Sequence, residues 1–191
     1  GWSVCMTGTA YALLLVNFAI SLPAQTHAAL AKEMVIVVNR NDPDSLSIGQ
    51  HYARQRGIPE SRIVQLSAPI KETITIAEYA KTVANPLLNA LIENEWVKGV
   101  KDRSKDAYGR ERLSVSIHNI PFVVLIKGVP LRIANDPLLL EESTANLSAQ
   151  FRVNNGSGDG EIALLLSRPQ TSMTALVPNP YFGKSSISST D

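Results

Sequence analysis

The sequence predicts an α/β protein with an open, mainly parallel β-sheet between two layers of helices. Three short apolar runs of strand length, Met34–Val38, Arg62–Leu66 and Phe122–Ile126, are separated by segments with helical spacing. This alternation is typical of a parallel sheet covered by helices. Of the 191 residues, 45% are hydrophobic and 18% are charged, which favours a packed domain. We expect one domain at 32–182 and a tail at 183–191.

The first thirty-one residues are expected to form an export segment. Ala10–Leu22 is uncharged and apolar, but it is shorter than the about 20 residues of a membrane span. Pro23 and several small residues follow, as in a secretory signal peptide, although the basic start is missing. We therefore expect a mature chain that begins near Ala29 or Lys32 and is periplasmic, bound in the cell envelope or secreted. A buried N-terminal helix and an uncleaved anchor are the alternatives.

Composition narrows the function classes. Cys5 is the only cysteine, so an internal disulfide and a cysteine-based zinc site are impossible. The net charge is +1 and aromatic residues do not alternate with basic runs, so we expect no nucleic-acid partner. A membrane is expected to be contacted only through the export segment. No pattern identifies a cofactor.

The first helix is predicted directly after the first strand. Asp42-Pro43 has the residue types of a helix cap followed by a first helical position. Ile48, Tyr52 and Ala53 have the spacing of one helical face, and Gly57 is placed to end the helix. The sequence thus predicts a strand, a helix and a second strand over the first part of the domain.

The second helix is predicted to begin at a capping box, Thr75–Glu78, and to kink near Asn85 because Pro86 lacks a backbone N–H group. Its apolar stripe consists of Tyr79, Val83, Leu87, Ala90 and Leu91. Lys98–Arg112 is polar and mostly charged, so we expect a solvated loop there. Contact between its basic excess and an anion is the alternative.

The pattern weakens beyond Ala134. Leu138–Gln150 is predicted to be a helix, and the glycine-rich segment at 154–160 is predicted to be a turn-rich break. Glu161–Leu166 is expected to be a strand or a short buried helix. We find no internal repeat.

Polar residues stand where the predicted strands end, which is where open α/β sheets bind ligands. Arg40 and Lys127 follow two different strands, and two cations at one edge suit a phosphate or a carboxylate. Internal ion pairs with Asp159, Glu161 or Glu141 are the alternative. Asp42 has a simpler role as a helix cap, and Asn39 and Asn41 tolerate turn geometry. The candidate ligand-binding residues are Asn39, Arg40, Asp42, Lys127, Gly128, Arg132, Asp159 and Glu161.

Four ordered motifs resemble an uncharacterised family of exported bacterial proteins. They are "VVNRNDPDS", "VLIKGVPLRI", "GDGEIALLL" and "NPYF", between Met34 and Phe182. The family pattern has SVDSELALL where this chain has Gly158 and Gly160 around Asp159, and these glycines loosen the backbone. The family carries no established activity, and its greater length implies a C-terminally truncated chain. The residues that match its motifs are Asn39, Arg40, Asp42, Lys127, Gly128, Pro130, Arg132, Asp159 and Glu161.

The sequence favours a ligand-binding protein over an enzyme, with a small anion, a carbohydrate or a partner protein at the sheet edge. The order of elements is Rossmann-like or caspase-like, but a Cys–His pair is lacking. The expected mature chain has no cysteine, His118 precedes its strand and His51 lies within a helix. A peptidase therefore needs a nucleophile from a missing C-terminal region. A metal-dependent hydrolase with Asp42, Asp159 and Glu161 as oxygen ligands is the second alternative. Acidic residues are common at strand ends, so we assign no metal site.

Overall fold

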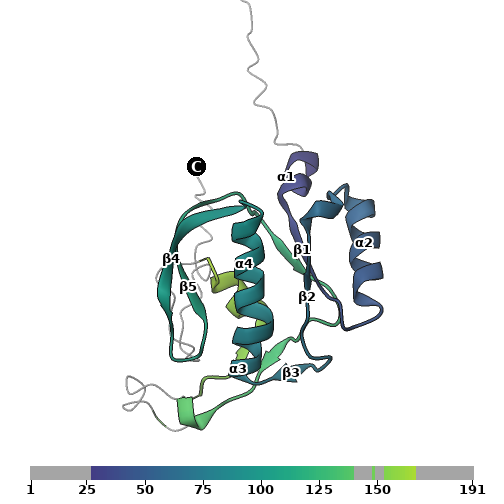
Figure 1. Ribbon diagram of the computed structural model, residues 1–191. Helices are drawn as coiled ribbons and strands as arrows, with labels where there is room; N and C mark the ends of the chain where they lie inside the picture. The colour runs from purple at the N-terminus through teal and green to yellow at the C-terminus, as the bar shows by residue number, and fades with distance from the viewer. Residues whose placement is uncertain (1–26, 140–147, 149–152, 167–191) are drawn as a thin grey trace, which may run out of the picture.

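A parallel three-stranded sheet forms the centre of the computed structural model, which describes residues 27–139, 148 and 153–166 (Figure 1). The strands are β1 (Val35–Asn39), β2 (Ile63–Leu66) and β6 (Val123–Leu125). Their order is β2-β1-β6, and β1 pairs in parallel with both neighbours. All five residues of β1 are buried. The three predicted strands and the mixed α/β class are thus confirmed.

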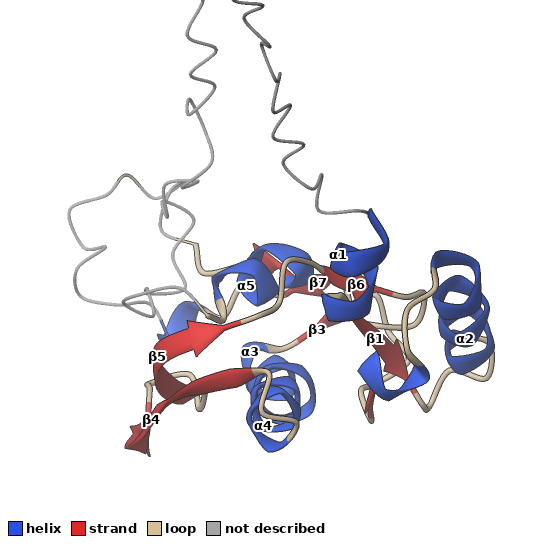
Figure 2. Cartoon of the chain, turned by 90° about the horizontal axis from the view of Figure 1, so that it is seen from above, coloured by secondary structure: helices blue, strands red, loops and turns tan. Residues whose placement is uncertain are grey.

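Alternate residues of β1 belong to two separate hydrophobic cores. Val35 and Val37 belong to the larger core, together with residues of α4 (Asn85–Glu93). Ile36 and Val38 belong to the smaller one. Figures 1 and 2 show α4 and α2 on opposite sides of the sheet. Because successive strand residues point to opposite faces, an unbroken apolar run was the correct sign of a strand covered on both sides.

The helix α1 (His27–Glu33) precedes the sheet and covers the smaller core. Ala31 is buried there and contributes to the same cluster as Ile36 and Ala53. The helix extends across the expected boundary between the export segment and the domain. Residues 1–26 lie outside the described part of the chain.

The helix α2 (Ser45–Arg56) begins three residues later than the predicted cap at Asp42. Its buried residues are Ser45, Gly49 and Ala53. Ala53 belongs to the smaller core and Tyr52 packs against it, as predicted, whereas Ile48 is 40% exposed, so the predicted apolar face was wrong at Ile48. The cause is close packing, because a Cβ atom on Gly49 would lie 2.5 Å from Val38 Cγ1. Small residues therefore face the sheet. Gly57 ends the helix as predicted, and its N–H group donates to Ala53 and Arg54 carbonyls.

The second helical region is interrupted close to Pro86, where the sequence predicts a kink. The capping box is present: Thr75 Oγ1 accepts from the Glu78 N–H group at 3.1 Å, and Glu78 Oε2 accepts from the Thr75 N–H group at 2.9 Å. Between α3 (Ile76–Tyr79) and α4 lies a π-helical turn, in which the Asn85 N–H group donates to the Ala80 carbonyl. This wider turn accommodates the residue that lacks an N–H group. The segments are η1 (Glu60–Arg62), β3 (Thr73–Ile74), α3 (Ile76–Tyr79) and η2 (Ala80–Ala84).

The charged segment predicted as a loop forms a β-hairpin instead. Its strands are β4 (Val97–Lys105) and β5 (Glu111–His118), which pair antiparallel. The Asp106 carboxylate organises the turn, because Oδ1 accepts from the Tyr108 and Arg110 N–H groups, both at 2.9 Å. Only β5 carries an apolar alternation, and eight of the nine β4 residues are exposed. Pairing with β5, not its own hydrophobic pattern, therefore makes β4 a strand.

The C-terminal described segments complete a second small sheet of order β3-β7-β8. The glycine-rich break is ordered: Ser157 Oγ accepts from the Gly160 N–H group at 3.2 Å and caps α5. Most of the segment Glu161–Leu166 is helical, because α5 ends at Leu164, and the prediction of a short helix is the one of the two that holds. Most of the predicted helix 138–150, Glu141 within it, and the "NPYF" motif lie outside the described residues. The segments are β7 (Arg132–Ile133), η3 (Pro137–Leu139), β8 (Gly156–Ser157) and α5 (Gly158–Leu164).

Candidate functional site

Asn39 ends β1 as a fully buried amide that joins three segments. Its Nδ2 group donates to the Ala68 carbonyl at 3.1 Å and to the Gly128 carbonyl at 2.7 Å. Its Oδ1 atom accepts from the N–H groups of Ala68 at 3.1 Å and Asn41 at 3.2 Å. Both donor hydrogens and the acceptor are thus used, as buried amides require. Asn39 fixes the ends of β1, β2 and β6 relative to one another.

Asp42 and Gly128 form a tight contact beside this amide. The Asp42 side chain is buried, and its Oδ1 atom accepts from the Asp44 N–H group at 3.0 Å. Gly128 has a φ of +97°, and a Cβ atom there would lie 2.6 Å from Asp42 Cβ. Glycine is required at this position by both the backbone conformation and the close approach. Asp42 therefore shapes the turn before α2, but the N-cap residue of the helix is Asp44.

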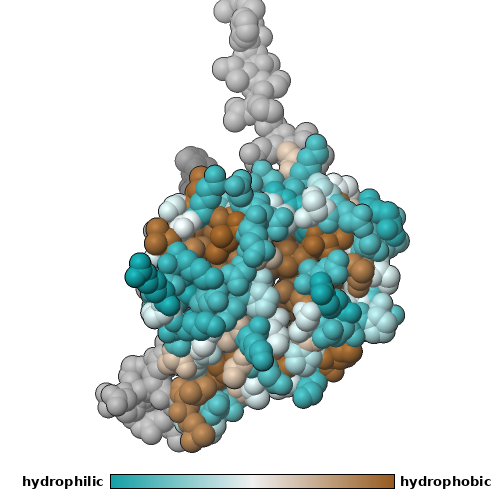
Figure 3. Space-filling model, in the orientation of Figure 1, coloured by the Kyte–Doolittle hydropathy of each residue, from teal (hydrophilic) through white to brown (hydrophobic). Residues whose placement is uncertain are grey.

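A groove opens at this carboxyl edge of the sheet, the edge at which the sequence predicts a site. It has a volume of about 380 Å³, and Ile70 and Leu131 are exposed apolar residues on it. Hydrophobic atoms are exposed at the lower right of Figure 3, beside the loop between β2 and β3. We call this feature the edge groove. It is lined by Asp42, Ile70, Lys71, Glu72, Leu125, Ile126, Lys127, Gly128, Val129 and Leu131.

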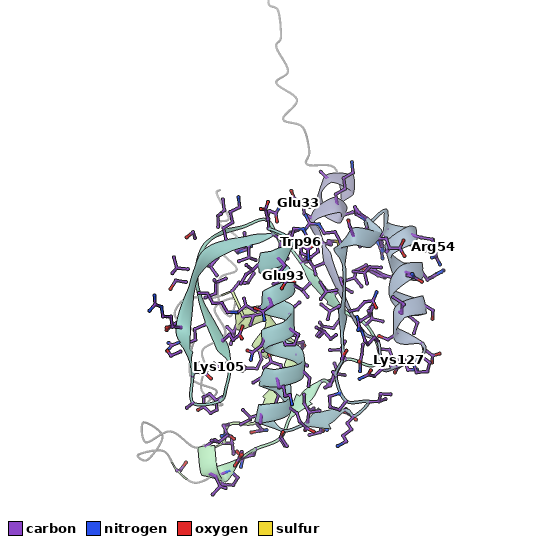
Figure 4. All side chains as sticks on the ribbon, viewed as in Figure 1. Glu33, Arg54, Glu93, Trp96, Lys105 and Lys127 are labelled. Atoms are coloured by element: carbon purple, nitrogen blue, oxygen red, sulfur yellow. The ribbon has the colours of Figure 1, made fainter. Side chains whose placement is uncertain are left out.

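Lys127 stands on the rim of the edge groove and is paired with Asp44. The Lys127 Nζ atom lies 2.8 Å from Asp44 Oδ2, and both side chains are 63% exposed. A hydrogen bond and charge attraction from Asp44, with further attraction from Asp42, raise the pKa of Lys127. Figure 4 shows Lys127 beside the first turn of α2, with Arg54 at the other end of that helix. The cation is thus held at the edge by an acid that the sequence analysis did not select.

Two other predicted cations lie apart from this pair. Arg40 is exposed at the end of β1; its N–H group donates to the Leu66 carbonyl, and its side chain forms no ion pair with a described residue. Arg132 lies on β7, where its Nε atom is 3.4 Å from Glu72 Oε1. Arg40 shares the carboxyl edge with Lys127, whereas Arg132 reaches the edge groove only through Glu72, one of its lining residues.

The two acidic residues of the glycine-rich motif lie elsewhere. Asp159 lines a second groove of about 360 Å³ with His118 and Phe122, near the start of β6. Glu161 faces the hairpin, where its Oε2 atom is 3.1 Å from Arg110 Nη1. The structure therefore divides the predicted residues, and among the described residues neither Arg40 nor Lys127 forms the alternative ion pair with Asp159 or Glu161.

Glu161 belongs to a buried charge cluster that the sequence analysis missed. Arg110 Nε is 2.7 Å from Asp106 Oδ2, and the side chains of Asp106, Arg110 and Glu161 are at most 14% exposed. Burial raises the pKa of Glu161; Arg110 opposes this effect and Asp106 adds to it. Burial, with a smaller effect of Glu161, also raises the pKa of Tyr79. No local pattern marked this cluster, because Arg110 and Glu161 are 51 residues apart along the chain.

The described residues do not bring together the groups of the hydrolase alternatives. His51 is exposed on α2, and His118 lies at the end of β5, where its Nδ1 atom is 3.4 Å from the Ile120 nitrogen. Within residues 27–139, 148 and 153–166, no three His, Cys, Asp or Glu side chains form a group that would hold a metal ion. No helix in the same ranges has the length and apolar character needed to cross a membrane.

Comparison with known proteins finds no matching family model, curated protein or solved structure.

Proposed function

We propose that the protein binds a small ligand with an apolar body and one anionic group in the edge groove of an open, three-layer α/β fold with Rossmann-like order. The two cores on opposite faces of β1 support the three layers. The observation that carries the proposal is the position of Lys127 on the rim of an apolar groove at the carboxyl edge of the sheet.

An anionic group can replace Asp44 at Lys127 at low cost. The Lys127–Asp44 pair is solvent-exposed, and exposed ion pairs contribute about 0–1 kcal/mol. Ile70 and Leu131 offer exposed apolar surface to the body of the ligand. Arg40 follows the neighbouring strand and supplies a second cation at this edge. The ligand class is therefore a small carboxylate or phosphate, with an uncharged carbohydrate or a partner protein as alternatives.

Lys127→Ala and Arg40→Ala are each expected to weaken binding of succinate or inorganic phosphate about ten-fold, because each removes a charge-assisted contact. NMR titration of the full chain, followed at the Gly128 amide, measures the affinity. Arg54→Ala is the matched control, since it removes an exposed cation at the other end of α2. If neither probe shifts Gly128 and Lys127→Ala lowers the melting temperature by several degrees, Lys127 is a structural ion-pair residue and the proposal fails.

We also propose that residues 1–31 direct export to the periplasm, the cell envelope or the medium. The apolar Ala10–Leu22 segment and the resemblance to exported proteins support this. Cleavage before Ala29 keeps Ala31 in the smaller core, so we favour Ala29 over Lys32 as the first mature residue. N-terminal sequencing of the protein from the producing cells tests this. A chain that retains Tyr11 would contradict export by cleavage.

The hydrolase alternative stays a prediction from the sequence, because no described contact favours it.

A further inference from the structure

The outer face of the β4–β5 hairpin exposes two large aliphatic side chains. Val100 is 73% exposed and Ile117 is 65% exposed. Lys98 pairs with Ile117 and Val100 pairs with Ser114, so the register places all four on one face. We call this set, together with the exposed Arg112 two residues before Ser114, the hairpin face. Its large aliphatic groups lie side by side with cations.

A β-bulge creates this arrangement. Between the pairs Lys98–Ile117 and Gly99–Val115 the register shifts, which leaves Ser116 as an extra residue in β5. In a regular strand Ile117 and Ser114 would point to opposite faces, because they are three positions apart. The bulge instead turns Ile117 outward while Leu113 and Val115 stay buried. The local backbone thus exposes an aliphatic side chain that a regular register would turn toward the core.

The hairpin is much more basic than the rest of the chain. It has six basic and three acidic residues, a charge of +3, whereas the whole chain has +1. Asp106 pairs with Arg110 and Glu111 pairs with Lys101, so these two acids and two cations offset one another. Asp102 is an exposed acid, and attraction to Arg112 is one of the causes that lower its pKa. The basic residues are Lys98, Lys101, Arg103, Lys105, Arg110 and Arg112.

Protection of exposed strand edges explains only part of this surface. Lysine on an edge strand discourages pairing with other chains, which accounts for cations along β4. It does not account for Val100 and Ile117, because exposed aliphatic groups favour association. Nucleic acid is a poorer fit, since the one aromatic residue of the hairpin, Tyr108, is buried and cannot stack on a base. Basic and aliphatic groups together match an anionic lipid surface.

We propose that the hairpin face binds an anionic lipid surface. Val100 and Ile117 enter the boundary between headgroups and acyl chains, and Lys98 and Arg112 contact lipid phosphates. Figures 1 and 2 show the hairpin as an outer layer, with α4 between it and the parallel sheet. A membrane can therefore approach the hairpin face without covering the edge groove, and this inference does not depend on the ligand proposed there.

The test uses a fluorescent label because the apolar Ala10–Leu22 segment will itself bind lipid. In the full chain with Cys5→Ser, an environment-sensitive dye is placed at Ser114→Cys on the hairpin face, or at Gln55→Cys on α2 as control. Phosphatidylcholine vesicles containing phosphatidylglycerol are expected to shift the emission to the blue at position 114 only. Pure phosphatidylcholine vesicles are expected to give no shift, and high salt should reverse it.

Two double variants with the label at position 114 separate the contributions. Lys98→Gln with Arg112→Gln is expected to weaken vesicle binding about 25-fold, roughly five-fold for each cation. Val100→Ser with Ile117→Ser is expected to abolish the blue shift. Lys32→Gln with Arg54→Gln removes two exposed cations elsewhere and should leave the signal unchanged, and unchanged melting temperatures show that each variant folds.

Three results would overturn the proposal. One is an equal shift at both labelled positions, which assigns lipid binding to the N-terminal segment. A second is a shift with duplex DNA but not with vesicles. The third is increased self-association of the variants with unchanged lipid affinity, which assigns the cations to protection of strand edges.

Discussion

Replacing Asn39 with alanine is expected to lower the free energy of unfolding by about 3–5 kcal/mol. The change removes the donor to the Gly128 carbonyl and the acceptor for the Ala68 N–H group, both of which lie at the joined ends of the strands. Each buried polar group left without a partner costs about 1–3 kcal/mol, and the lost side-chain volume adds to this. Thermal unfolding followed by circular dichroism should show a melting temperature lower by roughly 10 °C.

Asn41→Ala is the matched control for this variant. Asn41 is exposed, and its Nδ2 group donates to the same Ala68 carbonyl at 2.9 Å. We expect its loss to cost less than about 1 kcal/mol, because water can replace an exposed partner. An Asn39→Ala variant as stable as Asn41→Ala would show that the buried amide does not hold the three strand ends together.

Replacing Arg110 with methionine is expected to cost about 3–5 kcal/mol at neutral pH, because removal of one partner leaves buried charge without compensation. The variant leaves the Asp106 and Glu161 carboxylates without the guanidinium that contacts both. Arg103→Met is the control in the same hairpin. Arg103 is exposed, so its loss should cost less than about 1 kcal/mol.

The cost of Arg110→Met is expected to grow as the pH rises. Burial already raises the pKa of Glu161, and Arg110 opposes that rise, so the variant should raise the pKa of Glu161 further. A carboxyl group with a raised pKa in the folded state favours folding below its unfolded value, and this contribution is lost as the pH rises through the folded value. Urea unfolding should therefore show a smaller cost at pH 4 than at pH 7.

Glu161→Gln in the Arg110→Met background tests this cause directly. It removes the ionising group, so part of the stability lost at pH 7 should be regained and most of the additional pH dependence should disappear. If Arg110→Met lowers the free energy of unfolding equally at pH 4 and pH 7, packing of the arginine side chain, not its charge, stabilises the hairpin against α5.

The elements with strong local patterns were predictable. The buried run of β1, the capping box at Thr75 and the ending of α2 at Gly57 each depend on residues close in sequence. The hairpin was not predictable from the pattern of β4, since its place depends on pairing with β5 and on the Asp106 turn. The predicted apolar face of α2 was right for Tyr52 and Ala53 and wrong for Ile48, because close approach to β1 selects small residues at Gly49 and Ser45.

The candidate site was predictable only in part. The edge of the sheet and the position of Lys127 follow from strand order, and the edge groove lies there. The separation of Asp159 and Glu161 from that edge follows from the docking of α5, where the Gly158 N–H group donates to the Leu131 carbonyl at 2.7 Å. Such a contact between distant residues leaves no periodic pattern in the sequence from which it could be predicted. Asn39 was selected as a ligand residue, but its position directly after four buried residues indicated an interior role.

The hydrogen bond between Asn39 and Gly128 joins two residues that are synthesised at different times. The two residues are 89 positions apart, and ribosomes add about 5–20 residues per second. Asn39 therefore leaves the ribosome about 4–18 seconds before its partner, and β1 precedes β6 by a similar interval. During that time β1 can pair with β2 on one side only, and its other edge presents an apolar, unpaired strand to neighbouring chains. The most buried strand of the finished protein is thus the one most exposed to aggregation while the chain is being made.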